Sequence, residues 1–182
     1  SKSYVKFKII FHELNSTESE LIFEDEKVKV YTIPLHHRVY TNGFLFKEKE
    51  KLRKINISAV KKFKEIDVCD YNNLKAGKDF KLDSGDVIKN SELTCNPEKA
   101  VSYAYCSDTS YKPSIIEIIN GVDLLYHEST FLTDKEDLAA KTGHSTAKQA
   151  ARIAKKANVK KLVLGHYSSR YKNISLFKKE AQ

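Results

Sequence analysis

The chain has 182 residues, of which 41% are hydrophobic and 31% charged, and its formal net charge is +8. This is the composition of a globular protein with a sizeable core, and one domain is the default expectation at this length. No apolar run reaches the roughly 18 residues that cross a bilayer, so we expect no membrane-spanning segment. The positive charge is compatible with an anionic partner such as a nucleic acid, although charge alone identifies none.

The first quarter of the chain has the alternation of β-strands. Residues 4–11 alternate between polar and apolar side chains, and residues 21–35 give a short strand, an acidic turn and a second strand. FLF (residues 44–46) follows a loop that contains Asn42 and Gly43. These segments predict a mainly antiparallel sheet.

Residues 47–92 have a different character. Within residues 47–64, eight of eighteen residues are Lys or Arg and two are Glu, and turn signals follow at Gly77 and Gly85. We interpret residues 47–92 as a partly extended insertion with a cationic face. A solvated surface helix that binds nothing is the alternative for the lysine-rich run.

The second half of the chain alternates strands and helices. Strands are predicted at 101–108, 122–129 and 160–166, with a short helix at 114–121 that ends on Gly121. A longer helix begins at Ser145 or Thr146, and its packing face contains Ala147, Ala150, Ala151 and Ala154. The order β-α-β-α-β predicts a layered α/β arrangement, and the final residues, LFKKEAQ, show no evident element.

Polar residues that can bind metals recur where the predicted strands end. They are His36 and His37, Asp108, His127 and Glu128, and His166. Neighbouring parallel strands bring their carboxyl ends to one rim, where imidazoles and a carboxylate would form a ligand set suited to Zn²⁺. Each residue by itself could equally be a capped surface residue or a satisfied core residue.

His144 lies in GHSTA, at the entrance of the longer predicted helix. A histidine there can hydrogen-bond a phosphate or give it a proton, because the helix start also offers free N–H groups. An ordinary helix entrance with an exposed histidine is the alternative.

The cysteines are Cys69, Cys95 and Cys106, an odd number without CxxC spacing. This usage favours a reducing, cytoplasmic setting over a disulfide scaffold.

Five short motifs, in order, resemble those of the ribonuclease Z family, the tRNA 3′-processing endonucleases of the metallo-β-lactamase fold. They are PLHHRVYTNGF (34–44), YCSDT (105–109), HEST (127–130), GHSTA (143–147) and GHYSSRY (165–171). The resemblance covers nearly the whole chain. It implies an α/β fold of the metallo-β-lactamase type, an αββα sandwich that is incomplete here and carries an inserted arm. It also implies a homodimer.

The resemblance also implies roles for individual residues. His37 would bind one zinc ion, Asp108 would bridge two, and His166 would bind the second. His144 would contact the scissile phosphate and assist the leaving oxygen, and Glu128 would orient His144. RKIN, with Arg53, Lys54 and Asn56, resembles part of the family's loop that reads the tRNA 3′ region.

The chain departs from the family pattern in two respects. The HxHxDH signature, which supplies three histidine ligands and an aspartate base, is absent. We therefore expect the chain to be the later portion of a longer enzyme and to be inactive alone, because His37, Asp108 and His166 are too few to hold two zinc ions in catalytic geometry. The insertion also lacks the glycine–proline element of the family's arm, and its lysine-rich run would contact phosphates less specifically.

Together these observations predict a zinc-dependent endoribonuclease with three regions. Residues 1–46 would give core strands and one metal ligand, residues 47–92 a basic tRNA-binding arm, and residues 93–182 the α/β half with the remaining ligands and the HST motif. Arg170 and the lysine-rich run would add phosphate contacts on precursor tRNA. The alternatives are another phosphodiesterase or hydrolase of the same fold, a non-catalytic tRNA-binding half, and a structural fragment that packs against a partner.

Overall fold

The computed structural model describes residues 7–182 and divides the chain into two compact units. The first unit combines the chain up to Phe46 with Ser102–Gln182, and the second is Lys47–Val101. Within the described residues, no helix is long and apolar enough to cross a bilayer.

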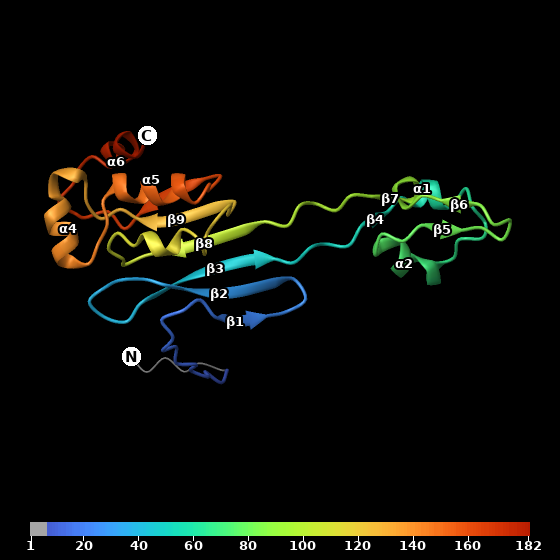
Figure 1. The fold of residues 1–182 in the computed structure, drawn as a ribbon, viewed down its shortest axis with the longest axis horizontal. Coiled ribbons are helices and arrows are strands. Elements are labelled where there is room, and N and C mark those ends of the chain that lie inside the picture. Colours follow the sequence, from blue (N-terminus) through green and yellow to red (C-terminus); the bar gives the residue numbers. More distant parts are fainter. Residues whose placement is uncertain (1–6) are drawn as a thin grey trace. The chain divides into compact units, whose positions relative to one another are not determined.

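The first unit is built on a six-stranded sheet in the order β1-β2-β3-β8-β9-β10 (Figure 1). The strands are β1 (Leu21–Glu24), β2 (Val28–Pro34), β3 (Asn42–Glu48), β8 (Ser102–Cys106), β9 (Leu124–Glu128) and β10 (Leu162–Gly165). β1 pairs antiparallel with β2, whereas β9 pairs in parallel with both β8 and β10. The predicted antiparallel start and the layered α/β second half are thus confirmed.

The helices of the first unit are α4 (Glu136–Thr142), α5 (Ala147–Lys156) and α6 (Ser175–Ala181), with 3₁₀ turns at Pro113–Ile115 and Thr133–Lys135. α5 begins as predicted: Thr146 Oγ1 accepts from the Gln149 backbone N–H at 3.2 Å, and the Gln149 side chain accepts from the Thr146 N–H at 3.0 Å. This reciprocal cap satisfies two N–H groups that a helix start leaves without partners.

One face of α5 packs into the core of the first unit. Ala147, Ala150, Ile153 and Ala154 are buried, whereas Ala151, which we placed on this face, is half-buried. Ile153 joins Ile33, Leu45, Ala104 and Leu125 in one hydrophobic cluster with residues of four strands. The small alanines bring the helix close to the sheet, and this fixes the loop that precedes the helix.

Three predictions about local structure are wrong. Residues 7–11 form no strand and expose Phe7 and Phe11, because an alternating pattern makes a strand only where a neighbour pairs with it; residues 4–6 lie outside the described residues. The helix predicted at 114–121 is only the 3₁₀ turn at Pro113–Ile115 and further turns up to Gly121. The chain end forms α6, which is anchored by Phe177, a fully buried side chain against Tyr167 and Tyr171.

The second unit has its own small core. Its elements are β4 (Lys54–Ile55), α1 (Ile57–Val60), a 3₁₀ turn (Val68–Asp70), α2 (Tyr71–Lys75), β5 (Phe80–Lys81), β6 (Val87–Ile88), α3 (Asn90–Leu93) and β7 (Thr94–Cys95). β4 pairs with β7 and β5 with β6, both antiparallel. Val60, Ile66, Leu74, Ile88 and Leu93 are buried together. The unit is therefore a folded body rather than a single surface helix.

Candidate metal centre

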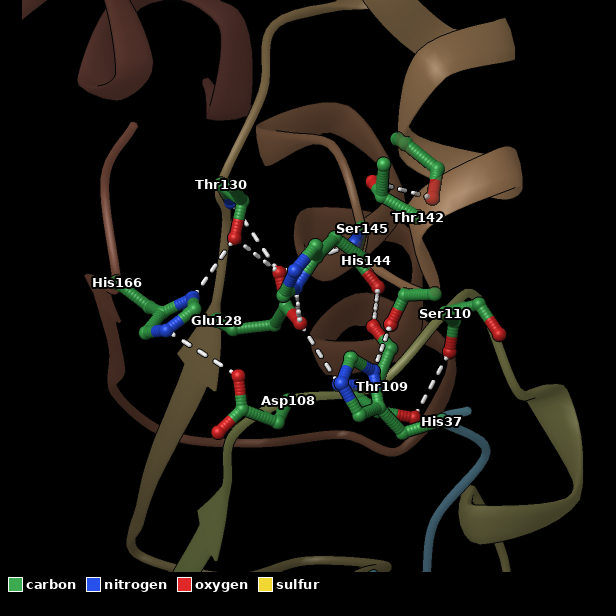
Figure 2. Close-up of polar contacts among 12 residues, drawn as sticks. His37, Asp108, Thr109, Ser110, Glu128, Thr130, Thr142, His144, Ser145 and His166 are labelled. Atoms are coloured by element: carbon green, nitrogen blue, oxygen red, sulfur yellow. Dashed lines mark hydrogen bonds and ion pairs between the residues drawn. The ribbon is translucent and has the colours of Figure 1, made fainter. Parts of the chain in front are cut away.

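The parallel strands of the first unit end at one edge of the sheet. Cys106 at the end of β8 pairs with His127, and Glu128 at the end of β9 pairs with Gly165. The residues that follow, Asp108 and His166, therefore lie near Glu128. His144 reaches the same place from the loop between α4 and α5 (Figure 2).

Asp108, Glu128, His144 and His166 form what we call the Asp–Glu–His cluster. One candidate ligand atom of each residue lies within 4.8 Å of those of the other three. The sequence predicted this convergence for the ends of the three strands.

Glu128 is the buried centre of the cluster, with a fully inaccessible side chain. Its Oε1 accepts from the Thr109 N–H at 2.7 Å and from His144 Nδ1 at 2.9 Å. Its Oε2 accepts from the Thr130 hydroxyl at 2.6 Å, the Ser145 N–H at 3.1 Å and the Thr130 N–H at 3.3 Å. A carboxylate has about four lone-pair directions, so these donors leave none for a metal ion. Although Glu128 lies within ligand distance, its contacts fit an orienting role.

The contact with Glu128 determines the tautomer of His144. A carboxylate only accepts hydrogen bonds, so His144 Nδ1 carries a proton and Nε2 is the atom left for other partners. The side chain is 15% exposed, and its ring centroid lies 5.1 Å from that of His37 and 5.2 Å from that of His166. His144 is thus fixed at Nδ1 by the buried Glu128, while its ring remains partly exposed.

His166 and Asp108 face each other across 3.2 Å, from His166 Nε2 to Asp108 Oδ1. Their side chains are 40% and 47% exposed. An unprotonated imidazole nitrogen would set a lone pair against a carboxylate lone pair, which is unfavourable unless a proton or a cation lies between them. Imidazole nitrogen and carboxylate oxygen are ligands that divalent zinc prefers, so this pair fits a metal ion.

His37 lies beside the cluster but outside the group of four. Its Nδ1 is 2.9 Å from the Gly143 carbonyl oxygen, an acceptor, so Nδ1 carries the proton and Nε2 is free to act as a ligand. Gly143 makes this approach possible: a Cβ there would lie 2.7 Å from His37 Nδ1, and the residue has a φ of +78°. His36, the neighbour, is exposed.

The backbone is strained at both members of the facing pair. In residues 7–182, the non-glycine residues with positive φ are Asp108 (+55°), Asn158 (+51°) and His166 (+59°). The left-handed region costs an L-residue with a Cβ roughly 1–2 kcal/mol. Such strain is concentrated at functional sites, where it sets the direction of a side chain.

His127 points away from this chemistry. It is buried, its Nδ1 donates to the Glu128 carbonyl at 2.7 Å, and its Nε2 has no partner among the described residues. Burial lowers the pKa of His127, so the ring is held neutral.

The remaining predicted site residues have local partners. Arg170 is exposed, with a guanidinium nitrogen 3.4 Å from Ser168 Oγ. In the second unit, Arg53 donates to Thr94 at 2.6 Å, Lys54 pairs with Glu98 at 2.9 Å, and the Asn56 side chain caps α1.

The sequence reasoning missed Thr109, Thr130 and Ser145, whose groups surround Glu128. All three lie inside the motifs SDT, HEST and HST. The bonds from Thr109 and Ser145 to Glu128 span 19 and 17 residues, and Thr130, although two residues from Glu128, also contacts His166, 36 residues away.

The sequence model of the Beta-lactamase superfamily domain matches residues 74–167. The chain is 46% identical to the ribonuclease Z of Bacteroides thetaiotaomicron over 175 residues, which are 96% of this chain and 55% of that protein. It spans 55–58% of the length of the first curated relatives it matches, all called ribonuclease Z.

Two solved structures share the fold. The human tRNase Z, short form, has a TM-score of 0.53 at 26% identity, over 85% of this chain and 42% of that one. The metallo-β-lactamase fold protein YhfI from Bacillus subtilis has a TM-score of 0.55 at 17% identity, over 92% of this chain and 46% of that one. These similarities confirm the expected fold and the resemblance to ribonuclease Z.

Proposed function

Because the chain belongs to the β-lactamase superfamily, we propose that it carries the proton-handling group and part of the zinc site of an endoribonuclease that removes the 3′ trailer from precursor tRNA. The observation that carries the proposal is the placement of two pairs side by side. His144 is held by the buried Glu128, and His166 faces Asp108. One pair suits proton transfer and the other suits a metal ion.

In the proposed reaction, water attacks a phosphodiester and the bond from phosphorus to the 3′ oxygen of the tRNA breaks. Two zinc ions, held by His37, Asp108 and His166 with further ligands from an HxHxDH segment, would supply a nucleophilic water at neutral pH and stabilise negative charge. With Nδ1 already protonated against Glu128, His144 would take up a second proton at Nε2 and give that proton to the leaving 3′ oxygen. Glu128 keeps that ring in the required orientation, and general acid catalysis of this kind contributes roughly 10²–10⁴-fold.

We propose that the second unit contacts the RNA backbone. A hollow of about 570 Å³ in this unit is lined by Arg53, Lys54 and Lys75, together with Tyr71 and three aliphatic residues. Cations bind phosphates, and an aromatic ring can stack on a base. Arg170 of the first unit would add a phosphate contact. Binding through these side chains should weaken steeply as salt rises.

Two further properties belong to the proposal. The cysteines are unpaired, and burial raises the pKa of Cys106 to about 12, which fits an inert core thiol in a reducing cytoplasm. The likeness to ribonuclease Z also favours a homodimer, which light scattering would test.

The test uses the chain alone and the chain joined to the part of the Bacteroides thetaiotaomicron relative that it does not match. We expect trailer cleavage and zinc binding only in the joined protein, and loss of both in its His166→Ala variant. His12→Ala removes an exposed histidine outside the cluster and serves as the control. Full cleavage and zinc content in His166→Ala would refute the ligand assignment. Activity on a chromogenic diester without activity on precursor tRNA would favour another hydrolase of this fold.

A further inference from the structure

The hydroxyl group of Thr130 lies between two groups of the candidate site. Thr130 Oγ1 donates to Glu128 Oε2 at 2.6 Å and lies 2.8 Å from His166 Nδ1 (Figure 2). Thr130 itself is buried, and its carbonyl accepts from the Ser168 N–H at 3.1 Å. The hydroxyl is therefore held in place from both sides.

The contacts from Glu128 through Thr130 to His166 determine where the protons lie. The hydroxyl has one proton, and a separation of 2.6 Å from a carboxylate oxygen is that of an O–H···O⁻ hydrogen bond. Having donated to Glu128, the Thr130 oxygen can only accept from His166, so the proton of the His166 ring is on Nδ1.

The opposite tautomer would suit the exposed contact with Asp108 at 3.2 Å but not the shorter, buried contact between Thr130 and Glu128. A proton on His166 Nε2 would require the Thr130 hydroxyl to turn towards Nδ1. Two oxygen lone pairs would then oppose each other across 2.6 Å, between Thr130 and Glu128. The protonated Nδ1 leaves the Nε2 lone pair directed at Asp108.

We propose that Thr130 is a positioning residue that fixes the tautomer of His166, so that one buried carboxylate presets two imidazoles at once. Glu128 holds His144 directly and His166 through the Thr130 hydroxyl. Both rings are thereby protonated at Nδ1 and present Nε2. Partners of this kind change metal affinity by about 10–100-fold when removed.

The first experiment needs no variant. Two-bond ¹H–¹⁵N spectra of the metal-free chain identify the protonated nitrogen of the His166 ring in its neutral form. The signals of His166 are those that vanish in His166→Gln. We expect the Nδ1–H tautomer. The Nε2–H tautomer in the wild-type protein would overturn the proposal.

Variants then test the cause. Thr130→Val keeps the shape and removes the hydroxyl, and we expect a shift towards the Nε2–H tautomer; in the joined protein, zinc affinity should fall about 10–100-fold. Thr130→Ser restores the hydroxyl and should restore both properties. Thr94→Val removes a hydroxyl from a buried threonine of the second unit and should change neither. An unchanged tautomer and zinc affinity in a folded Thr130→Val protein would refute the role.

The zinc measurement rests on the proposed function, whereas the tautomer measurement does not. An Nδ1–H tautomer that depends on Thr130, in a protein that binds no zinc, would retain the role of Thr130 and refute the metal site. Zinc binding together with an Nε2–H tautomer would retain the metal site and refute the role of Thr130.

Discussion

Replacing Glu128 by Gln tests the centre of the site with almost no change in volume. Glu128 accepts five hydrogen bonds, two at Oε1 and three at Oε2. In the variant, an NH₂ group must take the place of one oxygen. An NH₂ group in place of Oε1 opposes the Thr109 N–H, and one in place of Oε2 opposes the Ser145 N–H. The Thr130 hydroxyl and the His144 ring can reverse their roles, but a backbone N–H cannot.

The expected cost follows from this geometry. One buried N–H without a partner costs about 1–3 kcal/mol, and the loss of charge assistance in the remaining hydrogen bonds, partly offset because a neutral amide is less costly to bury than a carboxylate, adds about 1 kcal/mol in total. We expect Glu128→Gln to lower the free energy of unfolding by about 3 kcal/mol, which lowers Tm by about 6–12 °C at this chain length.

Calorimetry measures this loss and resolves separate transitions if the two units unfold independently. Glu117→Gln, at an exposed carboxylate, is the matched control and should leave the transition unchanged. A Glu128→Gln protein that melts within about 1 kcal/mol of the wild type would show that these donors do not depend on the carboxylate.

Three further predictions concern single residues. At Asp108, both the Gly and the Ala variant lose the carboxylate, but the left-handed backbone should make the Gly variant more stable by about 1 kcal/mol in urea unfolding. Equal stabilities of the two variants would argue against backbone strain. At His127, burial lowers the pKa of the ring, so its stabilising effect is present above the ordinary pKa of 6.5 and is lost as pH falls below it, at up to about 1.4 kcal/mol per pH unit. The Tm of His127→Gln should therefore depend less on pH between about 7 and 5 than that of the wild type. Parallel pH profiles of the two proteins would refute this. At Asp123, hydrogen bonds from Lys160 and Ser102 lower the pKa to about 2, so the contribution of this carboxylate to stability is present above pH 3.8 and is lost as pH falls through about 2. Solvent screening keeps this loss to at most about 1 kcal/mol. The stability of Asp123→Asn, measured by unfolding in acid, should lack the loss.

The sequence predicts those features of the site that depend on local pattern. Apolar runs that end on His166 or just before Asp108 identify strand ends, and the order of elements implies parallel neighbours that share an edge. Thr146 is recognisable as a helix cap because its partner, Gln149, is three residues away. These signals lie within single elements or in their order.

Other features depend on distances between segments and were not predictable. Thr130 looks like one more polar loop residue until β9 and β10 are placed side by side, when its hydroxyl meets His166. α6 is too short to give a clear helical pattern, and its stability comes from burying Phe177 against Tyr167 and Tyr171. The strand expected over residues 4–11 has the right alternation, but its described part, residues 7–11, does not form one.

The convergence of Thr109, Thr130 and Ser145 on a single side chain has a consequence for motion. The amide hydrogens of these three residues, from three separate loops, are protected by the same carboxylate. No loop can swing outward without breaking a bond to Glu128, so the three should open as one cooperative event. Slow deuterium uptake with a common rate at these amides would follow, and the rim around His144 would alternate between fully assembled and fully open.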